Sequence, residues 1–387
     1  MSAKTNRLRG LVLFVVVLYS VELLDELIYG LYGATLPYLK TDLALTYTQV
    51  GLLFTLPGLI GVMADPFIGL LGDTRHRRTL VIGGIVATMI GLLLASLAQV
   101  YGVLLLAFGV LYVASGAYVN LSQATLIDLN PNRAEHTLAR WTLLGSIGVT
   151  VSPLIVIAAF SIGYTWRSIY LACALIAALF VVLLFKQKFE SHHGARDESI
   201  SIRKLSRSLM AALRNRQMLK WIILTELADF MLDKLLEVTG LYFHDVVHVS
   251  LAGASAAVAV FTIVGLIGNG LIVPMLEKMR GVRLLRVTAI VALVAYTALL
   301  LAPIVWIKYV LIGVISFSTA GWFAILRAKC FEVLPGQSGV VIAVTSLANL
   351  LSLFVPFVLG SIADAIGLPT AMWLLAIGPV ALIIGVR

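Results

Sequence analysis

The chain has 387 residues, of which 60% are hydrophobic and only 12% are charged, and its formal net charge is +9. Soluble domains carry about 25% charged residues, so this composition excludes an ordinary soluble protein. The positive charge need not indicate a nucleic-acid partner, because most Lys and Arg residues fall in connections on one side of the predicted membrane topology.

Apolar runs of about 20 residues without strict alternation are typical of transmembrane helices rather than of barrel strands. The sequence therefore predicts an all-α integral membrane protein with twelve spans. They are expected at residues 10–38, 48–71, 79–99, 102–127, 138–161, 167–186, 219–243, 251–275, 284–304, 307–330, 337–362 and 367–386. An even number of spans and the one-sided basic residues place both termini in the cytoplasm. We expect a multi-pass protein of the inner (cytoplasmic) membrane, in contact with the lipid bilayer and without nucleic acid.

Carboxylates in the first and seventh predicted spans are the most informative feature of the chain. The first span contains Glu22, Asp25 and Glu26, and the seventh contains Glu226, Asp229, Asp233 and Glu237. An ionised side chain at a helix centre costs roughly 2.5–3.5 kcal/mol on insertion scales. Such residues therefore indicate a polar pathway for a proton, an ion or a charged substrate.

Helical geometry places these acids together with other polar groups. Tyr29 falls on the same side of the first span as its three acids, and Lys234 can reach Glu237 at i+3. Clustered carboxylates titrate as a coupled group. This suits proton coupling, and it equally suits a cationic substrate that competes with protons. The structural alternative is a static network, in which Asp233, Lys234 and Glu237 neutralise one another.

Further polar residues lie in the fourth and tenth predicted spans. Asn120 and Arg327 are candidate cavity residues, although Arg327 is close enough to the cytoplasm to extend its head group out of the lipid. Asp128 and Glu332 occupy matching positions near the inner ends of these spans, and we expect them to act in gating.

The two halves of the chain match at one offset. Adding 204 takes Glu22 to Glu226 (226 − 22 = 204) and Asp25 to Asp229 (229 − 25 = 204). We therefore expect two pseudo-symmetric six-helix bundles at residues 1–186 and 219–387, joined by a cytoplasmic linker at 187–218. Two parallel repeats of this kind are a transporter architecture.

The connection between the second and third spans carries a recognisable motif. It reads Gly69-Leu70-Leu71-Gly72-Asp73-Thr74-Arg75-His76-Arg77-Arg78. This resembles the signature loop of the major facilitator superfamily, Gly-x-Leu-(Ala/Gly)-Asp-Arg-x-Gly-Arg-Arg/Lys. Thr74 and His76 depart from the pattern.

The resemblance implies the family's fold and its alternating access, with two six-helix bundles rocking about a mid-membrane site lined by the first, fourth, seventh and tenth helices. It also implies a gating role for the loop. Gly69 would allow close helix approach, Asp73 would sit at the N-terminus of the eleventh helix, and Arg77 and Arg78 would pair with carboxylates across the two halves. Gly145, Gly148 and Pro153 in the fifth span are similar to a motif of the family's proton-driven exporters, although small residues there are usually packing devices.

The helix 1 carboxylates are similar to those of proton-coupled exporters of cationic and lipophilic drugs. The stretch Leu24-Asp25-Glu26-Leu27 also resembles the fosmidomycin-resistance branch. We expect proton-coupled antiport that exports a small cationic or amphipathic compound. One alternative is a carrier of divalent metal or organic cations bound directly by the carboxylates of helices 1 and 7. The other is a non-transporting sensor or scaffold.

The sequence contains no nucleophile–base set and no nucleotide-binding loop, so we do not expect an enzyme. We also expect no cofactor beyond a coupling proton or cation, and a monomer.

Overall fold

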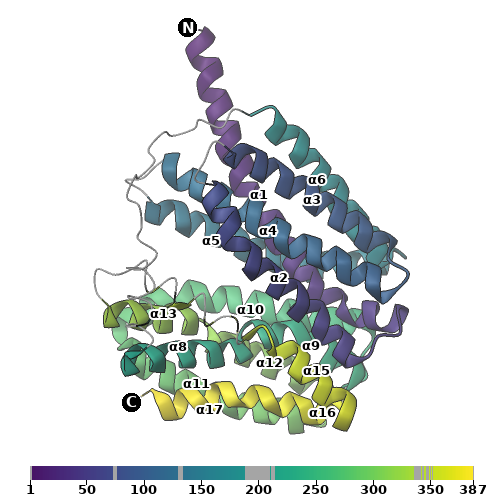
Figure 1. Ribbon diagram of the computed structural model, residues 1–387. Helices are drawn as coiled ribbons and strands as arrows, with labels where there is room; N and C mark the ends of the chain where they lie inside the picture. The colour runs from purple at the N-terminus through teal and green to yellow at the C-terminus, as the bar shows by residue number, and fades with distance from the viewer. Residues whose placement is uncertain are drawn as a thin grey trace. The chain divides into compact units, whose positions relative to one another are not determined.

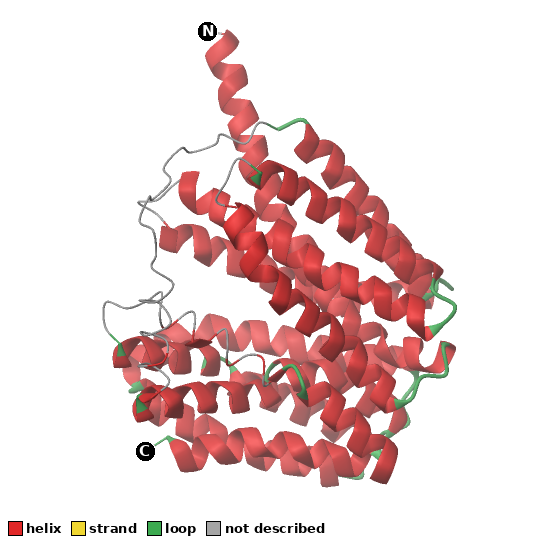
Figure 2. Ribbon diagram, viewed as in Figure 1, coloured by secondary structure: helices red, strands yellow, loops and turns green. Residues whose placement is uncertain are grey.

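The computed structural model describes residues 2–72, 76–129, 134–187, 210, 214–334, 341, 344–345, 348, 350 and 352–386. Within these ranges every regular element is a helix, which confirms the all-α prediction (Figure 2). The first half contains α1 (Ser2–Asp42), α2 (Tyr47–Gly72), α3 (Arg77–Leu97), α4 (Tyr101–Leu129), α5 (Ala134–Ser161) and α6 (Trp166–Phe185). The second half contains α8 (Arg216–Ala228), η2 (Asp229–Met231), α9 (Asp233–Asp245), α10 (Leu251–Lys278), α11 (Gly281–Leu301), α12 (Val305–Thr319), α13 (Trp322–Val333), α15 (Val355–Ile366), α16 (Leu368–Ala371), η3 (Met372–Ala376) and α17 (Ile377–Gly385).

Nine helical segments of the described residues are long and apolar enough to cross a membrane. The acidic segments α1 and α8–α9 are not among them, and neither is the short apolar helix α15. The two segments that carry the carboxylates are not among the nine, because the charges that indicate a polar pathway also make a segment less apolar. The number of twelve spans and the position of the termini remain predictions. Most of the expected linker, 187–218, lies outside the described residues.

The chain forms two compact units. Unit 1 comprises Met1–Leu45 and Leu52–Ala195, and unit 2 comprises Thr46–Gly51 and Arg196–Arg387. In unit 1, α1 packs against α5, and α3 packs against α4 and α6 (Figure 1). In unit 2, α10 packs against α12 and α9, and α8 packs against α13 and α17.

The contact between α1 and α5 depends on glycine. A Cβ added at Gly148 would lie 2.5 Å from the backbone oxygen of Leu23, and one at Gly145 would lie 2.8 Å from Oε1 of Glu22. Small residues permit such close backbone approach between membrane helices. Gly145 and Gly148 therefore have a packing role here.

Two predicted spans of unit 2 are interrupted. In the seventh, α8 gives way to the 3₁₀ turn η2, and Leu232 then departs from helical geometry with φ −93° and ψ −94°. In the tenth, α12 ends at Thr319 and Gly321 adopts φ +78° before α13 begins. The matching helices of unit 1 are unbroken, since α1 has 41 residues and α4 has 29. Interrupted helices in transporters often mark binding sites.

The first turn of α2 belongs to unit 2 and is capped by an aspartate of α15. The Asp364 carboxylate accepts hydrogen bonds from the backbone N–H groups of Tyr47 (2.9 Å) and Thr48 (2.8 Å). The Tyr47 hydroxyl also donates to Asp245 at 2.8 Å. A Cβ at Gly360 would lie 2.2 Å from the Tyr47 backbone oxygen, so this contact tolerates no larger residue.

Candidate functional site

Asp25 is held by two side chains of α4. Its Oδ2 accepts a hydrogen bond from the Ser115 hydroxyl (3.0 Å), and its Oδ1 accepts one from the Tyr118 hydroxyl (2.7 Å). Both donors are neutral. The spacing of Ser115 and Tyr118, at i and i+3, puts them on one face of α4, opposite Asp25 on α1.

A cavity of about 100 Å³ lies beside Asp25. Its lining comes from α1, α3 and α4 and consists of Asp25, Ile28, Tyr29, Tyr32, Thr88, Leu111, Tyr112, Ser115 and Tyr118. Asp25 and Tyr29, which the helical geometry places on one side of α1, both line this cavity, and their role in binding remains a prediction. Sequence reasoning missed Tyr32, Tyr112, Ser115 and Tyr118, although Tyr29 and Tyr32 follow Asp25 at i+4 and i+7 and so share its helix face.

Glu22 and Glu26 contact a different helix. Glu22 is buried, with 7% of its surface exposed, and the Trp141 side chain of α5 hydrogen-bonds to its carboxyl group. Carbon atoms of Glu26 lie beside Gly145 and Gly148 of the same helix. The helical wheel predicts one acidic stripe, but the structure divides it: Asp25 faces α4, and Glu22 and Glu26 face α5.

The second acidic cluster surrounds the interruption between α8 and α9. Lys234 Nζ lies 2.7 Å from Glu237 Oε1, and both side chains are buried, which confirms the predicted i, i+3 pair. Glu237 Oε2 is buried and has no hydrogen-bond partner in the part of the chain that the structure describes. Burying an acceptor without a partner is costly.

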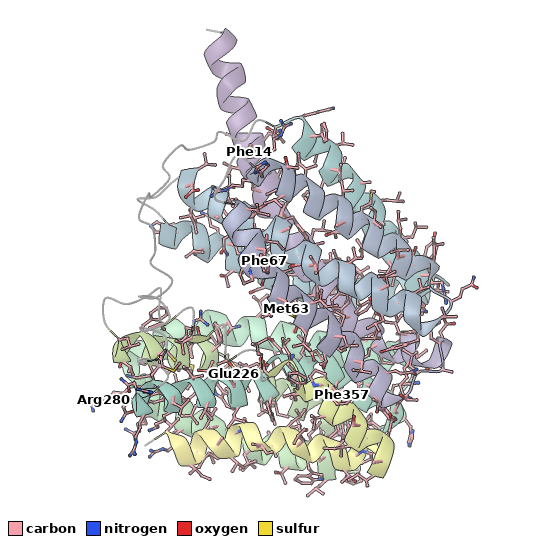
Figure 3. The ribbon with its side chains drawn as sticks, viewed as in Figure 1. Phe14, Met63, Phe67, Glu226, Arg280 and Phe357 are labelled. Atoms are coloured by element: carbon pink, nitrogen blue, oxygen red, sulfur yellow. The ribbon has the colours of Figure 1, made fainter. Side chains whose placement is uncertain are left out.

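Three further acids complete this cluster. Asp229 lies in η2, within electrostatic range of Glu226, Asp233, Lys234 and Glu237. Glu226, which is labelled in Figure 3, is buried on α8 and hydrogen-bonds to Ser352, whereas Asp233 is exposed in the first turn of α9. Lys234 is the one cation among these five residues, so the cluster carries excess negative charge when its acids are ionised.

The remaining candidate cavity residues are less enclosed. Asn120 is exposed on α4 and does not line the Asp25 cavity. The Arg327 guanidinium of α13 lies 5.6 Å from the centre of the Phe323 ring. Roles for Asn120 and Arg327 in substrate binding remain predictions.

The expected gating residues form pairs within their own units. Arg77 Nη1 lies 2.5 Å from Asp128 Oδ2, and Arg78 donates to the Phe185 carbonyl oxygen at 2.8 Å. Glu332 pairs with Lys329 at 2.6 Å. Arg77 thus has a carboxylate partner within unit 1, and pairing of Arg77 and Arg78 with carboxylates across the two halves remains a prediction.

Two other gating predictions have different outcomes. A Cβ added at Gly69 would have no described atom within 4 Å, so the close helix approach expected there is absent from the described residues. Asp73 lies outside the described residues, and its role remains a prediction.

No group of three or more His, Cys, Asp or Glu side chains suited to a metal ion occurs among the residues that the structure describes. Within unit 1, the carboxylates divide between partners on α4 and α5. The divalent-metal alternative finds no supporting site in this part of the chain.

Comparison with known proteins places this geometry in context. The family described as Major Facilitator Superfamily matches residues 18–355. The chain is 21% identical over 374 residues to the uncharacterized MFS-type transporter YfnC of Bacillus subtilis (strain 168), covering 93% of this chain and 88% of that protein. It is 23% identical over 333 residues to the fosmidomycin resistance protein of Escherichia coli (strain K12), covering 83% of this chain and 78% of that protein.

Solved structures show the same fold at low sequence identity. The nucleoside transporter NupG matches with a TM-score of 0.75 and 13% identity, covering 96% of this chain and 98% of that chain. A D-xylose-proton symporter matches with a TM-score of 0.74 and 16% identity, covering 97% of each chain.

Proposed function

Because this chain belongs to the Major Facilitator Superfamily, we propose that it is a proton-coupled antiporter that exports a small cationic or amphipathic compound across the inner membrane. The chain is a multi-pass membrane protein and a secondary transporter of a small molecule, not an enzyme. The proposal adds the coupling ion, the direction and the chemical character of the substrate.

The observation that carries the proposal is the environment of Asp25. Its hydrogen bonds come from Ser115 and Tyr118, which are both neutral. Asp25 is half-buried, and an ionised carboxylate that is partly withdrawn from water without a counter-charge is costly. Asp25 therefore needs either a proton or a cation, and a site that accepts one or the other is what exchange of a proton for a cationic substrate requires.

The cluster around Asp229 supports the same reading in unit 2. Asp229, Asp233 and Glu237 share the single cation Lys234, so this unit can also take up a proton without creating excess positive charge. The interruption at η2 gives the segment a point at which its geometry can change during alternating access. The fosmidomycin resistance protein, one of the relatives, supports export as the direction.

The test is substrate-driven proton movement in proteoliposomes. The proteoliposomes are prepared with an acidic interior, cationic compounds are added outside, and the internal pH is measured with a trapped dye. We expect wild type to release protons in exchange for cation, and Asp25→Asn and Asp229→Asn to lose this exchange by about 100-fold or more. Asp42→Asn is the matched control, because it makes the same chemical change at an exposed acid that pairs with Arg167, and it should retain the exchange.

Each result separates the candidate functions. Cation movement without proton movement would show a carrier of organic cations and contradict antiport. Failure of counterflow with every compound tried, in protein that is folded and inserted, would favour a sensor or scaffold.

A further inference from the structure

The cavity beside Asp25 has room for more than a proton. Its volume is about 100 Å³, and an enclosed apolar cavity of ~150 Å³ admits a molecule the size of benzene. A carboxylate that only binds and releases protons needs no such space. The cavity therefore leaves space for a small molecular partner beside Asp25.

That partner must be positive. Asp25 is half-buried, and two hydroxyl groups, those of Ser115 and Tyr118, donate hydrogen bonds to its carboxylate. The other lining residues include no Lys, Arg or His. A cation entering this cavity would supply the counter-charge that the walls lack.

The walls favour an organic cation over a metal ion. Tyr32 is 6% exposed and lies nearly parallel to Tyr112, with an interplanar angle of 8° and ring centres 6.2 Å apart. The ring of Phe108 supports Tyr32 from 4.6 Å, and Tyr29 meets it edge-on. Aromatic faces attract ammonium groups, whereas a hard divalent ion takes about six to eight oxygen ligands and Asp25 is the one acid in the lining.

We propose that this cavity binds a small primary or methylated ammonium group, with Asp25 as its counter-charge and Tyr32 and Tyr112 as its aromatic wall. The assignment rests on the proposed function and deepens it, since it names the substrate class as compounds with a compact ammonium head. The rest of such a compound would extend beyond the cavity.

The test is direct binding to the full-length protein in lipid nanodiscs. Methylammonium and tetramethylammonium are titrated calorimetrically at pH 8 in potassium buffer, and sodium is titrated separately. We expect saturable ammonium binding that Asp25→Asn weakens on the order of 100-fold, as expected for losing one partner of a buried charge pair. Tyr32→Leu should weaken it about 3- to 30-fold, and Tyr32→Phe should restore it, because phenylalanine keeps the aromatic face.

Two control variants distinguish a loss of packing from a loss of ammonium binding. Tyr170 of α6 is a fully buried tyrosine that does not line the cavity, so Tyr170→Leu should lose stability without losing ammonium affinity. If Tyr32→Leu fails to fold, Tyr112→Leu removes the less buried ring of the same wall and should weaken binding in the same range.

Three results would overturn the assignment. The first is that wild type shows no saturable ammonium binding, and the second is that ammonium binding survives Asp25→Asn. The third is that the protein binds sodium and Tyr32→Phe abolishes this binding, because the tyrosine hydroxyl would then be a metal ligand. The proposed function is judged independently in proteoliposomes. Proton exchange with other cations but no ammonium binding would overturn the site alone, and ammonium binding without any proton exchange would overturn the antiporter alone.

Discussion

At the scale of single residues, the carboxylates of the two acidic clusters differ in which groups stabilise their charge. Asp25 has hydroxyl donors, Glu22 has the Trp141 side chain, and Glu237 has the amine of Lys234. A group with a permanent cationic partner gains little from a transported cation, whereas Asp25, whose cavity lining includes no Lys, Arg or His, gains a counter-charge. This difference separates a structural ion pair in α9 from a candidate binding group in α1.

Removing Lys234 and removing Glu237 should lower the stability of the protein by unequal amounts. Lys234 also lies near Asp229 and Asp233, but Glu237 has Lys234 as its one cation among the described residues. Lys234→Met should therefore destabilise the protein by about 3–5 kcal/mol, the range for stranding one buried charge, and Glu237→Gln should cost less. The double variant Lys234→Met/Glu237→Gln should recover much of the loss.

The stability of all three variants is measured by thermal unfolding in detergent, which is monitored through the reaction of the buried thiols of Cys173 and Cys330 as they become exposed. Equal losses for the two single variants, or a double variant no better than Lys234→Met, would show that the pair does not stabilise α9 in this way.

At the scale of elements, helix ends are set by local chemistry that a sequence reveals, whereas the sequence signals one of the two helix interruptions and not the other. The predicted span 48–71 begins one residue after the observed start of α2 at Tyr47, and the predicted span 251–275 begins at the observed start of α10, Leu251. Ser250 caps α10 by accepting a hydrogen bond from the Gly253 N–H. The turn at Asp229–Met231 contains no Pro or Gly from which it could be predicted. Gly321 did offer a signal, because glycine permits the positive φ found there.

The cap on α2 is an element-scale feature with a defined pH dependence. Asp364 lies beyond the predicted span 337–362. Its burial raises the pKa, but hydrogen bonds from Thr48 and Tyr47 outweigh this and lower the pKa below its ordinary value of 3.8. A depressed pKa means that the cap is fully present above that value and is lost only as the pH falls through the still lower folded value.

We therefore expect amide protection of Thr46–Gly51 to be constant between pH 5 and pH 8. Asp364→Ala should reduce the protection factors about 2- to 30-fold, since losing a helix cap costs about 0.5–2 kcal/mol. Hydrogen exchange measured by mass spectrometry tests this, with Asp42→Ala as the control at another exposed acid. A protection factor that changes between pH 5 and pH 8 in wild type, but not in Asp364→Ala, would contradict the depressed pKa.

At the scale of the whole molecule, membership of the family and the helical class follow from features that the sequence contains. Hydropathy reports the spans, and the Gly69–Arg78 loop resembles the family motif. The neighbours of each acid do not follow, because a helical wheel gives the direction of a side chain but not the helix it meets. Glu22 and Asp25 are three residues apart and contact different helices, α5 and α4.

Both units carry acids that the proposed exchange uses, so their effects should not be independent. If Asp25 of unit 1 and Asp229 of unit 2 serve one transport cycle, removing either stops that cycle. The variant Asp25→Asn/Asp229→Asn should then be no slower than the slower single variant, because residues that act as a unit are strongly non-additive. Two acids that contribute independently to the rate would instead multiply the single effects.

Initial rates of cation-driven proton movement in proteoliposomes distinguish these cases, with each rate normalised to the amount of inserted protein. Asp42→Asn combined with Asp25→Asn provides the reference for additivity, since the exposed Asp42 belongs to a salt bridge with Arg167 and lies outside both acidic clusters. That reference should match Asp25→Asn alone. A double variant of Asp25 and Asp229 that is slower by the product of its single effects would show that the two acids contribute independently to the rate and do not act as a unit.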